Sequence, residues 1–446
     1  MTEAATPPPP AFPLKVAVLI WLGQVLSLLG SGLTSFALGV WTYETSGGVT
    51  RFALIMLCAS LPAILLGPVA GALVDRWNRR WVILLSDMTS GLMTLVLAAL
   101  HFTGQLQPWH AYFTTAVVSM ASAFQQPAFS VLVSTIVPAQ HLGRANGVVQ
   151  LGLAFSQLAA PLASASLLAM VGLEGILVID AATFLLGILP LLLLRIPVQY
   201  LVSPSQERPP PLATSVREGG AYLRASPGLL ILLGLLATTN FFTGAVEVLV
   251  TPLVLSLANV TTLATITTAG GLGMVAGSVA MSVWGGPKRR AHGILAFQLC
   301  GGLLLLLVGV TTSIPLLMGV AFCFFFSLPL INGTSQALLQ SQVPLELRGR
   351  VFAFTGTLSG AMLPLAYAIS GPLADLVFEP ALRPGGALVP FVGRLVGEGA
   401  GRGIAVMFFI AGAMTILVTA LAALSRSLRG LDDAEAAVSN PVAMSP

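Results

Sequence analysis

Residues 64–80 read ILLGPVAGALVDRWNRR, and this stretch decides the class of the protein. Residues 64–74 carry no charge, whereas four of the six residues from Asp75 to Arg80 are charged. An apolar segment that ends abruptly in arginines is typical of a membrane-spanning helix that ends at the cytoplasmic surface. The stretch therefore predicts a membrane-spanning helix whose last turn lies just before Asp75.

The composition of the whole chain points the same way. Of its 446 residues, 56% are hydrophobic and only 8% are charged. A soluble globular protein carries about 25% charged residues. The mean hydropathy of +0.93 agrees with this deficit. Soluble enzymes, nucleic-acid-binding proteins and disordered proteins are excluded, and a polytopic membrane protein remains.

Twelve apolar runs are long enough to cross a bilayer as helices, which takes about 20 residues each. They are continuous rather than alternating, which excludes membrane β-strands. We therefore predict an all-α polytopic membrane protein with twelve transmembrane helices. The runs are residues 16–42, 52–74, 81–100, 111–136, 145–171, 175–195, 228–256, 263–285, 291–311, 314–340, 350–377 and 403–424.

The basic residues predict the orientation. If both termini are cytoplasmic, 16 of the 20 Lys and Arg residues lie on the cytoplasmic side, and only Arg51, Arg383, Arg394 and Arg402 lie outside. Such a bias fixes topology. We expect a multi-pass protein of the cell (inner or plasma) membrane, with no cleaved signal peptide. The predicted divisions are a disordered tail 1–13, a six-helix bundle 14–195, a cytoplasmic linker 196–227 with a short surface helix, a second six-helix bundle 228–425, and a cytoplasmic tail 426–446, disordered from residue 430.

The two halves of the chain repeat each other. Gly67-Pro68-Val69-Ala70 and Gly277-Ser278-Val279-Ala280 each precede an Arg-Arg pair by nine residues, at an offset of 210. Val-Pro and Gly-Arg pairs recur in residues 137–144 and 343–350, at an offset of 206. Six spans is an even number, so both halves have the same sidedness. Two parallel-repeat six-helix bundles are a transporter architecture.

The loop from Gly71 to Arg80 resembles the signature loop of the major facilitator superfamily, with Asn78 at the position of a usual glycine. Asn tolerates positive φ next best after Gly, so we expect the turn to survive. The resemblance implies the fold of that superfamily and a conformational latch. In it, Asp75 lies against the start of the eleventh span, whose N-terminus is partially positive, and the loop arginines face Glu346. The implied latch residues are Gly71, Asp75, Arg76, Arg79, Arg80, Glu346, Gly349 and Arg350.

Other stretches resemble the branch that holds macrolide-efflux proteins and the enterobactin exporter. They include Phe124-Gln125-Gln126-Pro127-Ala128 and Gly143-Arg144-Ala145-Asn146-Gly147. Membership implies proton-coupled export of a drug, siderophore or secondary metabolite. The fifth span resembles a drifted antiporter motif, with ordinary packing of small residues as the alternative. Its matching positions are Gly147, Ser156, Ala160 and Pro161.

Four acids, but no Lys or Arg, fall within the cores of the spans: Asp87, Asp180, Glu247 and Asp375. Each costs about 2.5–3.5 kcal/mol at mid-bilayer, so each needs a reason. We expect Glu247 to couple transport to protons, with a hydrogen bond between helices as the alternative. We expect Asp87 to support the loop arginines, with proton coupling as the alternative. Asp180 is expected to be structural, and Asp375 to face water.

The resemblance also implies a central substrate cavity between spans one, four, seven and ten. Sparse uncharged polar groups in an apolar wall suit an amphiphilic organic molecule. The alternative is that many of these polar side chains only join helices to one another. The candidate cavity residues are Gln24, Thr34, Phe36, Gln125, Gln126, Asn240, Phe241, Asn332 and Gln336. No phosphate-binding motif is present, so we expect no ATP. We also expect no cofactor, metal or nucleic acid, and three cysteines that act as small buried hydrophobes.

The sequence thus predicts a monomeric proton-coupled efflux transporter, not an enzyme, working by alternating access. Its partners are the lipid bilayer, protons and a small-molecule substrate. A proton symporter or a lysolipid transporter of the same fold stays open. So does a protein of another class, a non-transporting membrane receptor or partner protein.

Overall fold

Helices form the whole regular structure of the residues that the computed structural model describes, which are 14–74, 77–136, 142–193 and 212–439. Each of the twelve apolar runs falls on a helix there. The membrane-length elements are α1 (Leu14–Ser46), α2 (Val49–Val74), α3 (Arg79–Phe102), α4 (Pro108–Ile136), α5 (Leu142–Leu193), α7 (Pro227–Leu257), α8 (Val260–Trp284), α9 (Arg290–Val310), α10 (Ile314–Gln342), the broken helix α11 (Leu345–Gly360) with α12 (Met362–Leu373), and α15 (Arg402–Leu424).

In the described part of the chain, ten helices are long and apolar enough to cross a membrane. The long α5 counts once among them, although two spans were predicted there. Gly172 divides it, because its φ of 69° and ψ of −174° are not helical. The 29-residue α4 has the length of a span but is not one of the ten. The prediction of a polytopic all-α membrane protein is therefore confirmed, and the twelve-helix count is consistent with it.

The helices form two compact units, which are the two halves of the sequence except that residues 39–60 belong with the C-terminal half. Unit 1 comprises the described residues of Met1–Leu38 and Leu61–Glu207, and unit 2 comprises those of Gly39–Ser60 and Arg208–Pro446. The end of α1 and the start of α2 thus belong with the C-terminal helices. The predicted divisions at 14–195 and 228–425 differ from these units at residues 39–60.

In unit 1, α3 packs against both α4 and α5. Apolar side chains from five helices form its core, among them Ile20, Ile83, Leu132 and Leu191, each no more than 2% exposed. The same helices also carry exposed large apolar side chains, the pattern expected for a bundle surrounded by lipid.

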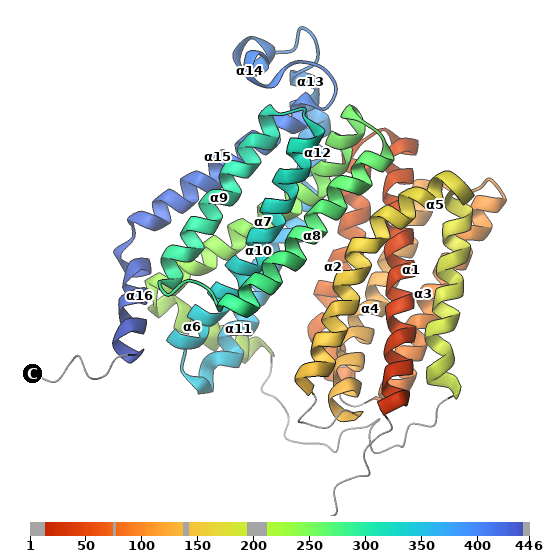
Figure 1. The fold of residues 1–446 in the computed structure, drawn as a ribbon, viewed down its shortest axis with the longest axis horizontal. Helices are drawn as coiled ribbons and strands as arrows, with labels where there is room; N and C mark the ends of the chain where they lie inside the picture. The colour runs from red at the N-terminus through yellow and green to blue at the C-terminus, as the bar shows by residue number, and fades with distance from the viewer. Residues whose placement is uncertain (1–13, 75–76, 137–141, 194–211, 440–446) are drawn as a thin grey trace, which may run out of the picture. The chain divides into compact units, whose positions relative to one another are not determined.

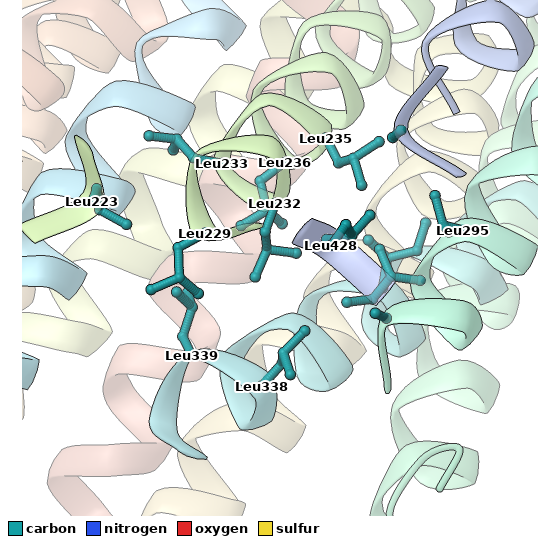
Figure 2. Packing of buried hydrophobic residues seen from close by; sticks show 14 of the residues in the cluster. Leu223, Leu229, Leu232, Leu233, Leu235, Leu236, Leu295, Leu338, Leu339 and Leu428 are labelled. Atoms are coloured by element: carbon teal, nitrogen blue, oxygen red, sulfur yellow. The ribbon is translucent and has the colours of Figure 1, made fainter. Parts of the chain in front are cut away.

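In unit 2, α9 and α15 lie side by side, and α10 packs against α8 and α9 (Figure 1). The shorter helices α6 (Leu212–Ala225) and α16 (Arg426–Ser439) join its core. Figure 2 shows Leu223 of α6 and Leu428 of α16 with the leucines of α7 and α10. The expected disorder from residue 430 is therefore wrong as far as Ser439. The reason is a buried leucine, which anchors the start of α16.

Residues 378–402, between the eleventh and twelfth predicted spans, contain the end of a π-helical turn, η3 (Ala374–Phe378), and the short helices α13 (Glu379–Ala381) and α14 (Val389–Val396). One further expectation is wrong. The cysteines are not all buried, since Cys300 and Cys323 are exposed and Cys58 is half-buried. In a membrane protein an apolar thiol can face lipid instead of a core.

Candidate transport and coupling site

Glu247 in unit 2 has a partner that the sequence analysis missed. It lies on α7, and the Tyr367 hydroxyl of α12 donates a hydrogen bond to its Oε2. Gly244, one turn earlier on α7, permits this contact, because a Cβ there would lie 3.0 Å from the Cβ of Ala366. Tyr367 is 5% exposed. The available signal was that Tyr367 is the one tyrosine in the predicted span 350–377.

A cavity of about 100 Å³ opens in the same unit between α7, α10 and α11. Three predicted cavity residues line it: Asn240, Asn332 and Gln336. Asn240 Nδ2 donates to the main-chain oxygen of Ser359 at 3.1 Å, whereas the two α10 side chains are exposed. Its remaining lining residues are uncharged and come from the same three helices. The cavity therefore offers amides and hydroxyls, and no charge, to a ligand.

Phe241 and Glu247 are not among the residues that line this cavity. Phe241 instead packs edge-on against Phe242, with ring centroids 5.4 Å apart. Glu247 lies seven residues beyond Asn240 on α7, which is about 10 Å along a helix axis. The cavity and the carboxylate are therefore neighbours on one helix without being one site.

Asp87 in unit 1 lies at the centre of a three-helix amide network. It is fully buried, with 0% exposure. Gln24 Nε2 of α1 donates to its Oδ2 at 2.9 Å, and Gln125 Nε2 of α4 donates to its Oδ1 at 2.6 Å. Gln125 also donates to Gln24 Oε1 at 3.1 Å. Two predicted cavity residues therefore serve as the donors to a buried carboxylate.

Both oxygens of Asp87 accept from these amides, and the expectation that Asp87 supports the loop arginines stays a prediction. Arg80 of the loop donates to the main-chain oxygen of Leu192 at 3.0 Å. Arg79 is buried, with 1% exposure. Asp87 lies about two turns beyond these arginines along α3.

Asp180 in unit 1 is surrounded by threonines. Thr34 of α1 donates to its Oδ2 at 2.7 Å, and Thr94 of α3 donates to the same atom at 3.2 Å. Its other oxygen, Oδ1, is buried without a hydrogen-bond partner among the described residues. Thr34, predicted to face the substrate, is therefore engaged inside the bundle. Thr94 was not among the residues predicted from the sequence, although its spacing of seven from Asp87 on α3 was a usable signal.

The antiporter-like positions of α5 pack against α1. Ser156 Oγ donates to the main-chain oxygen of Leu28 at 3.1 Å. A Cβ on Gly32 would lie 2.8 Å from the Cβ of Ala160, so the two helices touch through their backbones. Pro161 lies inside the helix and is half-buried. The side-chain surroundings of Gly147 lie outside the described residues. Close packing of α5 against α1 therefore explains why these positions of α5 carry small residues.

Much of the predicted latch lies outside the described residues, including Asp75 and Arg76 and the side-chain surroundings of Glu346 and Gly349. α11 begins at Leu345, as the latch requires. Arg350 forms an ion pair with Glu218 of the linker helix α6. Gly71 lies in α2 with open space around it.

Asn78 does not adopt positive φ, contrary to expectation. Its φ is −69°, and its side chain accepts a hydrogen bond from Arg80 N, so it caps α3. Of the other predicted cavity residues, Phe36 is half-buried and Gln126 is exposed. Asp375 does not simply face water, because main-chain N–H groups of α2 donate to both of its oxygens.

Comparison with known proteins places this geometry in a family. The sequence profile described as Major Facilitator Superfamily matches residues 20–367. The chain is 26% identical to macrolide efflux protein A of Streptococcus pyogenes over 376 residues, which cover 80% of this chain and 89% of that protein. It is 27% identical to macrolide efflux protein A of Enterococcus faecalis over 334 residues, covering 69% of this chain and 96% of that protein.

The fold has solved relatives. The crystal structure of a bacterial homologue of the human lysosomal transporter Spinster, in an inward-facing and unoccupied conformation, superimposes with a TM-score of 0.69. The match covers 94% of this chain and 97% of that chain at 15% sequence identity. At that identity the likeness concerns the fold alone.

Proposed function

Because the chain belongs to the Major Facilitator Superfamily, and is therefore a membrane transporter and not an enzyme, we propose that it is a proton-coupled efflux transporter. It exports an amphiphilic organic molecule from the cytoplasm by alternating access, with both termini cytoplasmic and as a monomer. The relatives called macrolide efflux proteins, which match most of the chain, support export of a compound of that kind.

The uncharged cavity of unit 2 supports an amphiphilic cargo. Amides at Asn240, Asn332 and Gln336 can each donate and accept hydrogen bonds. Apolar side chains such as Leu236 and Phe352 complete its wall. A macrolide carries many hydroxyl and carbonyl oxygens on an apolar ring, which matches such a lining in chemistry. A cavity of about 100 Å³ holds only part of that molecule, so this is one subsite of a larger path.

The pair formed by Glu247 and Tyr367 is the observation that carries proton coupling. A hydroxyl donates to an ionised carboxylate and, after rotating, accepts from a protonated one. The contact can therefore persist through both protonation states of the acid. Proton uptake then removes a charge from α7 without leaving the phenol unpartnered. This would favour a different packing of α7 in each state, which is what coupling requires.

Asp87 is the second coupling candidate, and its neighbours make it the weaker one. Its two oxygens accept from amide N–H groups, which stabilise the ionised form. Uptake of a proton would place a new O–H where donors already point. We therefore propose that Asp87 holds a fixed negative charge inside unit 1, where the two amides stabilise it.

The test is macrolide transport in proteoliposomes by the Glu247→Gln variant. We expect proton-gradient-driven transport to be lost, while exchange of labelled for unlabelled macrolide without a gradient continues at a rate near that of the wild type. The amide keeps the shape and a hydrogen-bond partner for Tyr367 but cannot cycle a proton. The matched control is Glu379→Gln, an acid of the same unit that accepts only main-chain N–H groups.

Two outcomes would refute the proposal. Full gradient-driven transport by Glu247→Gln would remove Glu247 from coupling. Absence of both driven transport and exchange in the wild-type protein, with macrolide binding retained, would favour a receptor over a transporter.

A further inference from the structure

Asp375 binds the start of α2, a helix more than three hundred residues earlier in the sequence. Its Oδ1 accepts from Val49 N at 3.0 Å, and its Oδ2 accepts from Thr50 N at 2.8 Å. The first N–H groups of a helix have no partner within the helix. They also carry the positive end of the helix dipole, which favours a carboxylate. Both oxygens of Asp375 are therefore used by a strong N-terminal cap.

Glycines bring the two backbones together at this point. A Cβ on Gly371, one turn before Asp375, would lie 2.7 Å from the Cα of Thr50 and 2.8 Å from the Cβ of Ala53. A Cβ on Gly48 would lie 3.2 Å from Asp375 Oδ2. Real Cβ atoms do not approach backbone carbons so closely, so only glycine at position 371 allows this contact. The cap and the close approach are independent features of one joint.

A second acid on the same segment provides an internal comparison. Glu379, four residues after Asp375, caps α15 through Ile404 N at 3.1 Å and Gly401 N at 3.3 Å. Its contact joins two neighbouring elements of the C-terminal half. Asp375 instead joins the C-terminal half to a helix from the N-terminal half. The chemistry of the two caps is alike, and only the helix that they hold differs.

The helix that Asp375 holds is shared between the units. Its first part, up to Ser60, belongs to unit 2, and its continuation from Leu61 belongs to unit 1. Alternating access requires the two units to move relative to each other. Residues 39–60 must then either stay with unit 2 or leave it, and the cap on Val49 and Thr50 is a contact that such a separation would break.

We propose that Asp375, Gly371 and the start of α2 form a clamp, the Asp375 clamp, that holds one end of the transport path closed and opens for substrate release. This proposal rests on the proposed alternating access. The clamp lies at the end of α2 opposite to the Asp75 loop. The broken helix 345–378 takes part in both acid contacts. Its start is the expected partner of Asp75 from the end of α2, whereas its far end carries Asp375, which contacts the start of α2. A rocking motion that closes one end opens the other, so the two acid contacts alternate.

The clamp is tested by distances between spin labels at Thr45→Cys and Ala387→Cys, two exposed positions of unit 2, with Cys58, Cys300 and Cys323 replaced by Ser. The measurement uses purified protein in lipid nanodiscs without substrate or gradient. Asp375→Asn removes one acceptor and turns a donor toward the α2 N–H groups. We expect the ratio of long to short distances to rise by about tenfold, the effect of losing one charge-assisted hydrogen bond.

Gly371→Ala is the second variant, because it separates the same backbones without changing charge. It should shift the distances in the same direction if Asp375→Asn fails to fold. Glu379→Gln is the matched control and should leave them unchanged. A label pair at Thr312→Cys and Ala387→Cys should not move in any variant.

Unchanged Thr45–Ala387 distances in folded Asp375→Asn and Gly371→Ala would overturn the clamp. The same increase in Glu379→Gln would also overturn it, since general loosening would then explain the result. Because no transport is measured, loss of proton coupling at Glu247 would leave this outcome untouched. A failure of the clamp and a failure of the proposed coupling can therefore be told apart.

Discussion

Asp87 of unit 1 and Glu247 of unit 2 are both carboxylates inside helix bundles, yet their neighbours are of different kinds. Two glutamine amides donate to Asp87, whereas one tyrosine hydroxyl donates to Glu247. An amide N–H can only donate, but a hydroxyl can also accept. The difference teaches that burial alone does not identify a coupling acid. We infer that the partner decides whether the acid stays ionised or can take up a proton.

The comparison predicts the largest stability effect in unit 1. Gln125→Leu leaves Asp87 Oδ1 buried beside an apolar group. We expect a loss of about 2–3 kcal/mol in the free energy of unfolding, because an ionised acceptor loses its donor. Tyr367→Phe should cost only about 1 kcal/mol, since Glu247 can become neutral instead. Reversible unfolding in mixed detergent micelles measures both.

Gln126→Leu is the control for this prediction, because Gln126 is the exposed neighbour on the same helix. It should change the free energy of unfolding little. If Tyr367→Phe proves more destabilising than Gln125→Leu, then Glu247 is the fixed charge and the assignment of the two acids is reversed.

The sequence was sufficient to predict the class, the helices and the family. Composition and runs of apolar residues are properties of whole segments, so one atypical residue does not change the prediction. Partners across helices could not be predicted in the same way. Nothing in the sequence near Glu247 indicates Tyr367, because the pairing depends on how α7 packs on α12. Asp375 looked like a helix end in water for the same reason, since its partners at Val49 and Thr50 lie on α2.

Close packing around Asp180 gives the next largest effect. A Cβ on Gly30 would lie 2.0 Å from Thr183 Oγ1 and 2.7 Å from Asp180 Oδ1. Gly30→Ala should therefore cost about 1–3 kcal/mol by overpacking. Gly234→Ala in unit 2 is the matched control, because no heavy atom lies within 4 Å of its added Cβ. We expect that variant to unfold no more easily than the wild type, since alanine is the better helix former.

The Gly30 pair tests whether unit 1 holds its acids in a tightly packed interior. Equal melting temperatures for Gly30→Ala and Gly234→Ala would mean that the threonines around Asp180 yield freely. In that case the packing of unit 1 could not hold a buried carboxylate in one fixed environment, and the proposed difference between Asp87 and Glu247 would lose support.

The smallest expected effects are at two helix starts, where the units should behave alike. Asn78 caps α3 in unit 1 by accepting from Arg80 N at 3.1 Å, and Asn259 caps α8 in unit 2 by accepting from Thr262 N at 2.9 Å. Alanine at either position should cost about 1 kcal/mol, and serine should restore most of it. Thermal unfolding of the two alanine variants provides the measurement.

The Asn78→Gly variant distinguishes a role of Asn78 as a helix cap from a role in a left-handed turn. The family's usual residue there is glycine, and a position of positive φ would be stabilised by that replacement. Asn78 has a φ of −69° and caps with its side chain, so Asn78→Gly should instead cost a few tenths of a kcal/mol. An increase in stability would show that the loop before α3 uses a left-handed turn, and that the cap contributes less than the backbone conformation.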